Sequence, residues 1–264
     1  MAIKLIALDL DGTLLTSDKK ITTRTKDIIA RAMARGVTVT IATGRMLRSA
    51  LYFTRLLASD APVVCCNGGY VGRAEGAPVF ARYFDPALTR EFLTFAYERS
   101  WYVNWYRGLD IYAPEYRAEY FTAYRTTAGF VVHEVGDDYL RYTENVPQFV
   151  LRELDAGIDA YVRTVREHFG NQLLPQQNTG TSVDINPPGV NKAVGVKALA
   201  DAMGLGLDEV MVAGDADNDY EMLEMGAFSV VPENGLPEAK ERASYVTASN
   251  DANGIALAIE KFVL

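Results

Sequence analysis

Apolar and polar positions in the first third of the chain alternate between strand and helix patterns. Ile3–Leu8 is an apolar run typical of a parallel strand that is covered on both faces. Thr22–Arg35 has helical spacing and ends at Gly36, a residue that commonly terminates helices. A strand, a helix and a third strand follow in the same rhythm, at Val37–Ala42, Met46–Ser59 and Pro62–Cys66. This order predicts a doubly wound parallel sheet.

The pattern changes between about Tyr83 and Pro187, where aromatic residues are frequent and the predicted strands are short. Strands are expected at Tyr102–Tyr106, Ile111–Ala113, Gln148–Glu153 and Ser182–Asn186. Helices are expected at Pro86–Ser100, Glu115–Ala128 and Gly157–Phe169. This middle part therefore predicts a separate α+β unit.

The strand and helix alternation resumes in the last third of the chain. The expected elements are a helix, a strand, a helix, a strand and a final helix, at Lys192–Met203, Glu209–Ala213, Asn218–Met225, Phe228–Val231 and Ala252–Phe262. The predicted fold class is α/β. We expect a Rossmann-like, doubly wound parallel-sheet core formed by residues 1–82 and 189–264, with an α+β cap domain inserted at residues 83–188.

The net charge of −8 argues against nucleic acid or an anionic membrane as a partner. No apolar stretch approaches the roughly 18–20 residues of a membrane span, and the first residues do not resemble a signal peptide. The two cysteines, Cys65 and Cys66, are adjacent, and neighbouring cysteines rarely meet disulfide geometry. These observations predict a cytoplasmic protein and leave its oligomeric state open.

Two carboxylates, Asp9 and Asp11, follow the first predicted strand one residue apart. Side chains at i and i+2 of a strand point to the same face, so the two would lie side by side if strand geometry continued. Two like charges about 4 Å apart repel by about 1 kcal/mol in bulk water and about 4 kcal/mol at an effective dielectric near 20. Either nearby cations offset this repulsion or one acid keeps its proton.

Polar residues follow every predicted strand of the core. Ligands of open parallel sheets bind at the carboxyl ends of the strands, so these residues should converge on one edge. The candidate site residues are Asp9, Asp11, Gly12, Thr13, Thr43, Gly44, Arg45, Asn67, Gly68, Lys192, Asp215, Asn218 and Asp219.

These residues fall into four motifs in a fixed order. They are a DxDGT sequence at 9–13, a threonine at 43, a lysine at 192 and a GDxxND sequence at 214–219. In this respect the chain resembles the haloacid dehalogenase superfamily of phosphotransferases over essentially its whole length. The large insertion and the closing NGIALAIEKF are most similar to the Cof-type subgroup with an α/β (type IIB) cap. Ala193 stands where that family commonly has glycine.

The resemblance implies a phosphatase that hydrolyses a small phosphomonoester of the sugar phosphate, nucleotide, flavin mononucleotide or pyridoxal phosphate class. Asp9 would be the nucleophile that forms an aspartyl-phosphate. Asp11 would act as general acid and then as general base, and an acid next to another carboxylate should have a raised pKa. Thr43 and Lys192 would bind the phosphate, with Gly44, Arg45, Asn67 and Gly68 beside them.

The resemblance also implies a Mg²⁺ ion, held by Asp9, Asp215 and the backbone carbonyl of Asp11. Asn218 is expected at the substrate and Asp219 at the metal, either as a direct ligand or through a water molecule, and both would orient Lys192 or a metal-bound water. With Asp11 protonated and no dication present, Asp9, Asp215, Asp219, Lys192 and a phosphomonoester would together carry a charge of about −4, so a metal ion is expected.

Several alternatives stay open on the sequence. Arg45 would either contact the ligand or stabilise the acidic edge, and Asn67-Gly68 could form only a turn. Asp217 is expected to be a helix N-cap. A phosphomutase would use the same site, whereas a non-catalytic sensor would bind phosphorylated ligands without releasing phosphate. A P-type ATPase is disfavoured because that pattern has threonine in place of Asp11.

Overall fold

The computed structural model describes residues 2–124, 130–153, 157–179 and 181–264. The chain forms two compact units. The first, here called the core unit, comprises Met1–Arg45, Ala50–Phe80 and Asn191–Leu264, and the second, the inserted unit, comprises Met46–Ser49 and Ala81–Val190. Met46–Ser49 groups with the inserted unit through Arg48, whose guanidinium binds the carbonyl of Leu109 and the carboxylate of Asp110.

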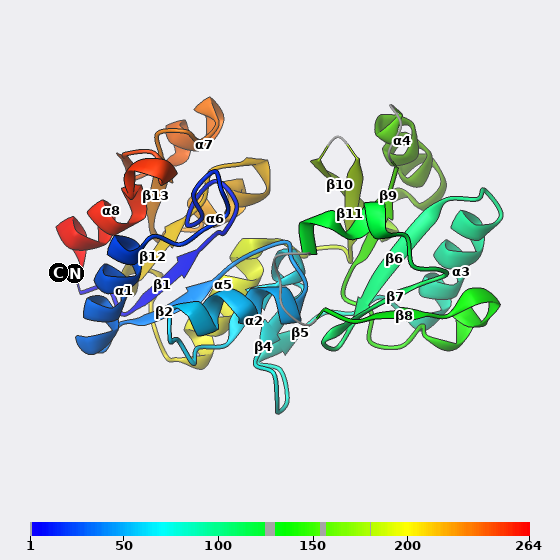
Figure 1. Cartoon of the computed structure of the whole chain (residues 1–264), viewed down its shortest axis with the longest axis horizontal. Helices are drawn as coiled ribbons and strands as arrows, with labels where there is room; N and C mark the ends of the chain where they lie inside the picture. Colours follow the sequence, from blue (N-terminus) through cyan, green and yellow to red (C-terminus); the bar gives the residue numbers. More distant parts are fainter. Residues whose placement is uncertain (1, 125–129, 154–156, 180) are drawn as a thin grey trace. The chain divides into compact units, whose positions relative to one another are not determined.

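The core unit contains a five-stranded parallel sheet (Figure 1). Its strand order is β14-β13-β12-β1-β2, and every neighbouring pair is parallel. The strands are β1 (Leu5–Leu8), β2 (Thr38–Ile41), β12 (Val210–Ala213), β13 (Phe228–Pro232) and β14 (Tyr245–Thr247). The carboxyl ends of these strands therefore meet at one edge of the sheet.

Helices cover both faces of this sheet. On β1, Ile6 and Leu8 belong to one apolar cluster, which also contains residues of helices α1 (Thr23–Ala34) and α8 (Gly254–Phe262). The alternate residues Leu5 and Ala7 belong to a second cluster, with residues of α5 (Lys192–Ala202) and α6 (Tyr220–Leu223). The doubly wound α/β fold predicted from the sequence is confirmed. The core unit also holds most of α2 (Leu47–Leu56), and α7 (Pro237–Arg242).

A smaller sheet of three strands continues from the edge of the main one. It consists of β3 (Val63–Cys65), β4 (Tyr70–Gly72) and β5 (Phe80–Ala81). A parallel bridge between Ala42 and Val64 joins the end of β2 to β3. The turn after β3, a 3-10 segment at Cys66–Gly68, is thereby held beside the loop after β2.

The inserted unit is built on a six-stranded mixed sheet with the order β10-β11-β9-β6-β7-β8. Helices α3 (Pro86–Tyr97) and α4 (Ile158–Phe169) contribute aromatic residues to a core that includes Trp105 and Phe149 of this sheet. The strands are β6 (Tyr102–Arg107), β7 (Asp110–Ala113), β8 (Val132–Glu134), β9 (Phe149–Arg152), β10 (Leu174–Thr179) and β11 (Ser182–Asn186).

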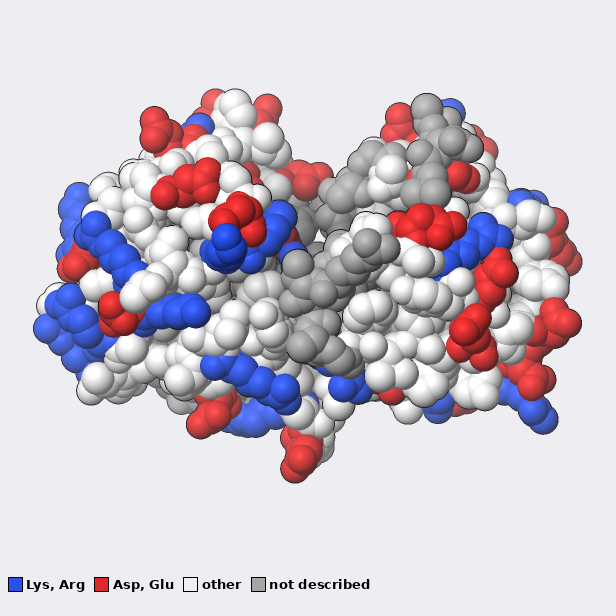
Figure 2. Space-filling model, viewed as in Figure 1, with Lys and Arg blue, Asp and Glu red and all other residues white. Residues whose placement is uncertain are grey.

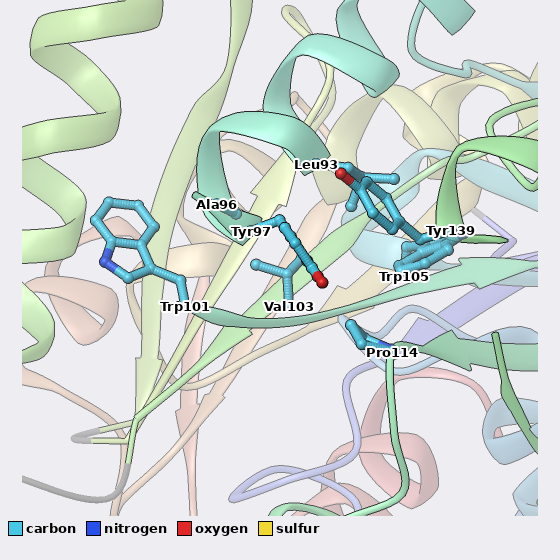
Figure 3. A pocket seen from close by; sticks show the side chains of 8 residues that line it. All are labelled: Leu93, Ala96, Tyr97, Trp101, Val103, Trp105, Pro114 and Tyr139. Carbon is cyan, nitrogen blue, oxygen red and sulfur yellow. The ribbon is translucent and has the colours of Figure 1, made fainter. Parts of the chain in front are cut away.

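An apolar pocket lies in the inserted unit between α3 and β6 (Figure 3). Aromatic rings, including Tyr97, Trp105 and Tyr139, make up much of its lining. The described residues that line it include no acidic or basic side chain, so this pocket offers no charged group that would bind a phosphate.

The prediction of a helix at Glu115–Ala128 is wrong for the residues of this range that the structure describes. Ala118–Tyr124 is a 3-10 segment with a kink at Phe121, and residues 125–129 lie outside the described residues. The ring of Tyr120 stacks on Tyr102, and Phe121 is fully buried. We attribute the irregular backbone to these tertiary contacts, which override the helical spacing of the sequence. The short elements β8, β10, α7 and β14 were not expected either.

Acidic side chains lie among basic ones on the face of the molecule that Figure 2 draws. Among the described residues, none of the helices has the length and apolar character needed to cross a membrane.

Candidate active site

A buried ammonium group lies at the centre of the candidate site. The Nζ atom of Lys192 donates hydrogen bonds to Oδ1 of Asp9 and to Oδ1 of Asp219, each over 2.7 Å. Lys192 is only 1% exposed and Asp9 only 5%. Charges this deeply buried are stable only when they are paired, so the three side chains form one electrostatic unit.

The fold brings these three residues together from distant parts of the chain. Asp9 directly follows β1, Asp219 lies in the 3-10 turn after β12, and Lys192 is the first residue of α5. The start of α5 lies against the turn after β3. A Cβ atom on Gly68, where φ is +89°, would come within 2.0 Å of the Asn191 carbonyl oxygen, so only glycine permits this approach.

Asp219 uses both carboxylate oxygens to shape the loop after β12. Its Oδ1 accepts from Lys192, and its Oδ2 accepts from the backbone amides of Asp215, at 2.9 Å, and Ala216, at 3.2 Å. Asp219 therefore fixes the position of Asp215. Asp217 is not the helix N-cap expected from the sequence, because α6 starts at Tyr220 with Asp219 as its N-terminal flanking residue.

Three carboxylates form a cluster that could hold a metal ion. One oxygen each of Asp9, Asp215 and Asp219 lies within 4.8 Å of the others. Oxygen ligands suit a hard divalent cation. Because the oxygens of Asp219 already accept hydrogen bonds from Lys192 and two backbone amides, Asp9 and Asp215 are the better direct ligands. The Thr13 hydroxyl donates to Oδ1 of Asp215 over 2.6 Å and orients that carboxylate.

The pKa values of the cluster indicate excess negative charge. Burial, together with the nearby carboxylates of Asp219 and Asp215, raises the pKa of Asp9 well above its usual range, although Lys192 opposes the shift. Burial is also the main cause that raises the pKa of Asp215 to about 6. Burial lowers the pKa of Lys192, but the two carboxylates more than compensate, so its pKa lies above the ordinary value. A divalent cation would relieve this excess of negative charge.

Asp11 differs from the expectation that its pKa is raised. Burial does raise it, but the hydrogen bonds and charges of Arg45 and Lys19 outweigh burial, and the pKa of Asp11 lies below its ordinary value. Arg45 binds the carboxylate with two nitrogens, Nε and Nη2, each at 2.8 Å, and Nζ of Lys19 lies 2.8 Å away. The expected acid is therefore an ion-paired carboxylate in this structure.

The expected repulsion between Asp9 and Asp11 is thus offset by cations. Strand β1 ends at Leu8, so neither carboxylate lies within the strand. Asp9 pairs with Lys192, while Asp11 pairs with Arg45 and Lys19. A close approach between the two loops that carry carboxylates requires glycine at position 12, where φ is +90° and a Cβ atom would lie 2.3 Å from Oδ2 of Asp215.

The loops after β2 and β3 hold the remaining predicted residues. The Thr43 hydroxyl accepts from the Arg45 amide at 3.2 Å, across Gly44, and the Asn67 amide donates to the Thr43 carbonyl at 3.1 Å. Among the described residues, Asn218 makes no hydrogen bond to Lys192. The side-chain nitrogen Nδ2 of Asn218 instead donates to Oδ1 of Asn67 over 3.5 Å. Arg45 contacts Asp11, as the alternative in which it stabilises the acidic edge predicted.

A segment with no expected role in the site touches both carboxylate-bearing loops. Nδ2 of Asn234 donates to the carbonyl of Gly12 over 2.8 Å, and the amide of Leu236 donates to the carbonyl of Asp215 over 2.8 Å. Oδ1 of Asn234 accepts from the Asn250 amide at 2.9 Å. Residues 234–236 therefore set the distance between the loop of Asp9 and the loop of Asp215. Asn234 and Gly235 are residue types common in turns, and they were the only sequence signal for this segment.

Comparisons with known proteins agree with this geometry. The family model described as haloacid dehalogenase-like hydrolase matches residues 6–259. A protein of Streptococcus pyogenes serotype M6 that is named as a phosphatase is 33% identical over 281 residues, with 100% of each chain covered. The 5-amino-6-(5-phospho-D-ribitylamino)uracil phosphatase YitU of Bacillus subtilis is 28% identical over 266 residues, covering 98% of this chain and 97% of the relative.

Solved structures show the same fold. A haloacid dehalogenase-like hydrolase from Bacteroides thetaiotaomicron superposes with a TM-score of 0.89 at 23% sequence identity, covering 98% of this chain and 99% of its own. The family resemblance read from the four motifs is therefore confirmed.

Replacing Asp215 by asparagine should stabilise the metal-free protein at neutral pH. A carboxyl whose pKa is raised by folding, here to about 6 from 3.8, reduces stability above pH 6, and this cost fades as the pH falls toward 4. We expect a gain of up to about 3 kcal/mol at pH 7.5 that shrinks to about 1 kcal/mol at pH 4.5. Urea unfolding of the parent and of the Asp215→Asn variant, both with chelator present, measures this difference in the free energy of unfolding. A variant that is less stable than the parent at both pH values would contradict this assignment.

Replacing Asn234 by alanine should weaken metal binding about 10-fold or more, because it frees the loop between Asp9 and Asp215. Calorimetric titration of the metal-free protein with Mg²⁺ measures the effect directly. Asp251→Ala is the matched control, since Asp251 holds the same loop farther out through the amide and hydroxyl of Ser17. Equal losses of affinity in both variants would show that Asn234 has no special role.

Proposed function

Because the chain belongs to the haloacid dehalogenase-like hydrolases, we propose that it hydrolyses a small phosphomonoester in two steps, with the phosphoryl group carried on Asp9. Its relatives named as phosphatases place it among the hydrolases of phosphoric monoesters. The observation that carries the proposal is the buried Lys192, which binds Asp9 and Asp219 beside Asp215. A structural ion pair would not need a third, partly exposed carboxylate at the same point.

In the first step, Asp9 attacks the phosphorus atom. Oδ1 of Asp9 accepts from Lys192, and among the described residues Oδ2 receives no hydrogen bond, so Oδ2 is the proposed attacking atom. The bond between Oδ2 and phosphorus forms while the bond between phosphorus and the leaving oxygen breaks. The leaving oxygen takes a proton from Asp11.

In the second step, Asp11 accepts a proton from water, and the resulting hydroxide attacks the phosphorus atom. The bond between Asp9 and phosphorus breaks, which releases phosphate and restores the carboxylate. The ion-paired Asp11 of this structure corresponds to the base required here. For the first step, Asp11 must take up a proton, and we propose that its side chain then exchanges Arg45 and Lys19 for the substrate.

Other residues of the core unit would bind the phosphate oxygens. The buried Thr43 hydroxyl, the Gly44 amide and the Lys192 ammonium are the proposed donors. Asn67 and Gly68 would lie beside these donors. The side-chain amide of Asn218 would hold Asn67 in place.

Mg²⁺ is the divalent cation that we propose for the carboxylate cluster. Asp9, Asp215 and the backbone carbonyl of Asp11 would hold it, and its charge would neutralise phosphate oxygens that would otherwise repel Asp9. Asp219 would act indirectly, by holding Asp215 and Lys192.

We assign leaving-group recognition to the inserted unit, as a cap domain. The substrate would be a small phosphorylated metabolite, of the sugar phosphate, nucleotide, flavin mononucleotide or pyridoxal phosphate class. The relative YitU, named for a phosphoribityl substrate, supports a metabolite of this size. Cys65 and Cys66 are both buried, and neither forms a disulfide within the described residues, which supports the cytoplasmic location that we propose.

Replacing Asp9 by asparagine should lower kcat on p-nitrophenyl phosphate at least about 1,000-fold, because the amide cannot act as the nucleophile. Adding excess chelator to the unmodified protein should remove activity, and added Mg²⁺ should restore it. Asp217→Asn is the matched control, because Asp217 lies in the same loop as Asp215 but is exposed, and within the described part of the chain its carboxylate accepts only from the backbone amide of Asn218. Full activity of Asp9→Asn, or activity that chelator does not affect, would refute the proposal.

A further inference from the structure

The loop that carries Asp9 and Asp11 is held by a residue near the end of the chain. Nδ2 of Asn250 donates to the carbonyl of Leu15 over 2.8 Å. The backbone amide of Asn250 donates to Oδ1 of Asn234 over 2.9 Å. Both bonds lie within the core unit, and Asn250 is only 9% exposed. The side chain and the backbone of one buried residue therefore hold two different partners.

The carbonyl of Leu15 matters because Leu15 closes the loop that contains Asp11. The amide of Leu15 donates to the carbonyl of Leu10 over 2.8 Å, and the amide of Leu14 donates to the carbonyl of Asp9 over 3.2 Å. Leu15 also forms a β-bridge with Asp11, and both Leu10 and Leu15 are fully buried. A displacement of the Leu15 peptide is therefore transmitted to the backbone beside Asp11.

Asn250 itself lies on a well-supported turn. It begins a 3-10 segment between β14 and α8. The hydroxyl of Thr247, the last residue of β14, donates over 2.8 Å to the carbonyl of Gly254, the first residue of α8. This bond joins the strand to the helix across the turn. A side chain on such a support can fix the position of the loop that it binds.

Two asparagines hold different sides of the loop. Asn234 belongs to the segment that also binds the loop of Asp215. Among the described residues, the side chain of Asn250 makes no hydrogen bond to the loop of Asp215 and binds only the Leu15 carbonyl. Loss of this side chain would therefore free the part of the loop beside Asp11. The bond to Asn234 would stay, because it uses the backbone of Asn250.

We infer that Asn250 is a positioning residue for Asp11, the proposed acid and base of the reaction. The inference rests on the proposed function and adds to it a residue outside the four motifs. Proton transfer requires a donor and an acceptor within about 2.6–3.2 Å, so a small displacement of Asp11 slows it strongly. The contact between Lys192 and Asp9 does not involve the side chain of Asn250.

The experiment compares two substrates whose leaving groups differ in their need for a proton. They are p-nitrophenyl phosphate, whose leaving oxygen is stable as an anion, and phenyl phosphate, whose leaving oxygen is more basic. Asn250→Ala should lower kcat/KM about 10- to 100-fold for phenyl phosphate and less than about threefold for p-nitrophenyl phosphate. Asn250→Ser keeps a shorter donor and should lie between the parent and Asn250→Ala. It decides the question if Asn250→Ala does not fold.

Mg²⁺ binding separates the role of Asn250 from that of Asn234. In calorimetric titration, Asn250→Ala should change the dissociation constant of Mg²⁺ less than about threefold, in contrast with the larger loss expected for Asn234→Ala. A loss of Mg²⁺ affinity as large as that of Asn234→Ala would refute the assignment of Asn250 to Asp11.

Val210→Ala is the matched control for stability. Val210 is fully buried at the start of β12, whereas the candidate site lies at the carboxyl ends of the strands. Its apolar cluster is also a different one from that of Leu15. Val210→Ala should lower the unfolding temperature and leave the ratio of the two kcat/KM values unchanged.

The possible failures are distinguishable. A parent protein that hydrolyses neither substrate would refute the proposed function, and one that hydrolyses only p-nitrophenyl phosphate would refute Asp11 as the acid and this inference with it. An active parent in which Asn250→Ala keeps both kcat/KM values, or loses both equally, would refute only the positioning role. The same selective loss in Val210→Ala would assign the effect to stability and refute that role too.

Discussion

The burial of one ammonium group organises the candidate active site. Transfer of a charge from water to a protein interior costs several kcal/mol even after relaxation, and removing one partner of a buried pair typically costs about 3–5 kcal/mol. Lys192 is compatible with its surroundings only because Asp9 and Asp219 both accept from it. The same contact opposes the rise in the pKa of Asp9 that burial and the carboxylates of Asp219 and Asp215 cause. The three carboxylates and Lys192 thus form a cluster with a deficit of positive charge.

Two carboxylates that are close in sequence are separated by the cations that bind them. Asp9 is buried and faces Lys192, whereas Asp11 faces Arg45 and Lys19 in a more exposed setting. The environment raises the pKa of the first and lowers that of the second. The two carboxyl groups therefore differ because of their environments and not because of the chemistry of aspartate itself.

Much of the core unit was predictable because local signals and tertiary packing agree there. The apolar runs around β1, β2 and β12 lie in the sheet, and the polar residues that follow them lie at its carboxyl edge. The 3-10 segment at Ala118–Tyr124 could not be predicted, because stacking of Tyr120 on Tyr102 joins residues that are distant in sequence.

Contacts between residues that are distant in sequence also explain why some predictions about the site were wrong. The lowered pKa of Asp11 depends on Arg45, which lies 34 residues away, and no local pattern reveals that pairing. The role of Asn234 depends on a bond to the carbonyl of Gly12, at a separation of 222 residues. Sequence motifs predicted which side chains meet but not which partners each one has.

The central claim is that Asp9, held by Lys192, accepts the phosphoryl group. Rapid acid quenching during turnover, followed by tandem mass spectrometry of the digested protein, tests it most directly. The account predicts a phosphoryl group on the peptide that contains Asp9, assigned to the Asp9 carboxylate, and its disappearance once the substrate is consumed. A phosphoryl group on another residue, or rapid phosphate release with no phosphorylated protein at any quench time, would contradict it.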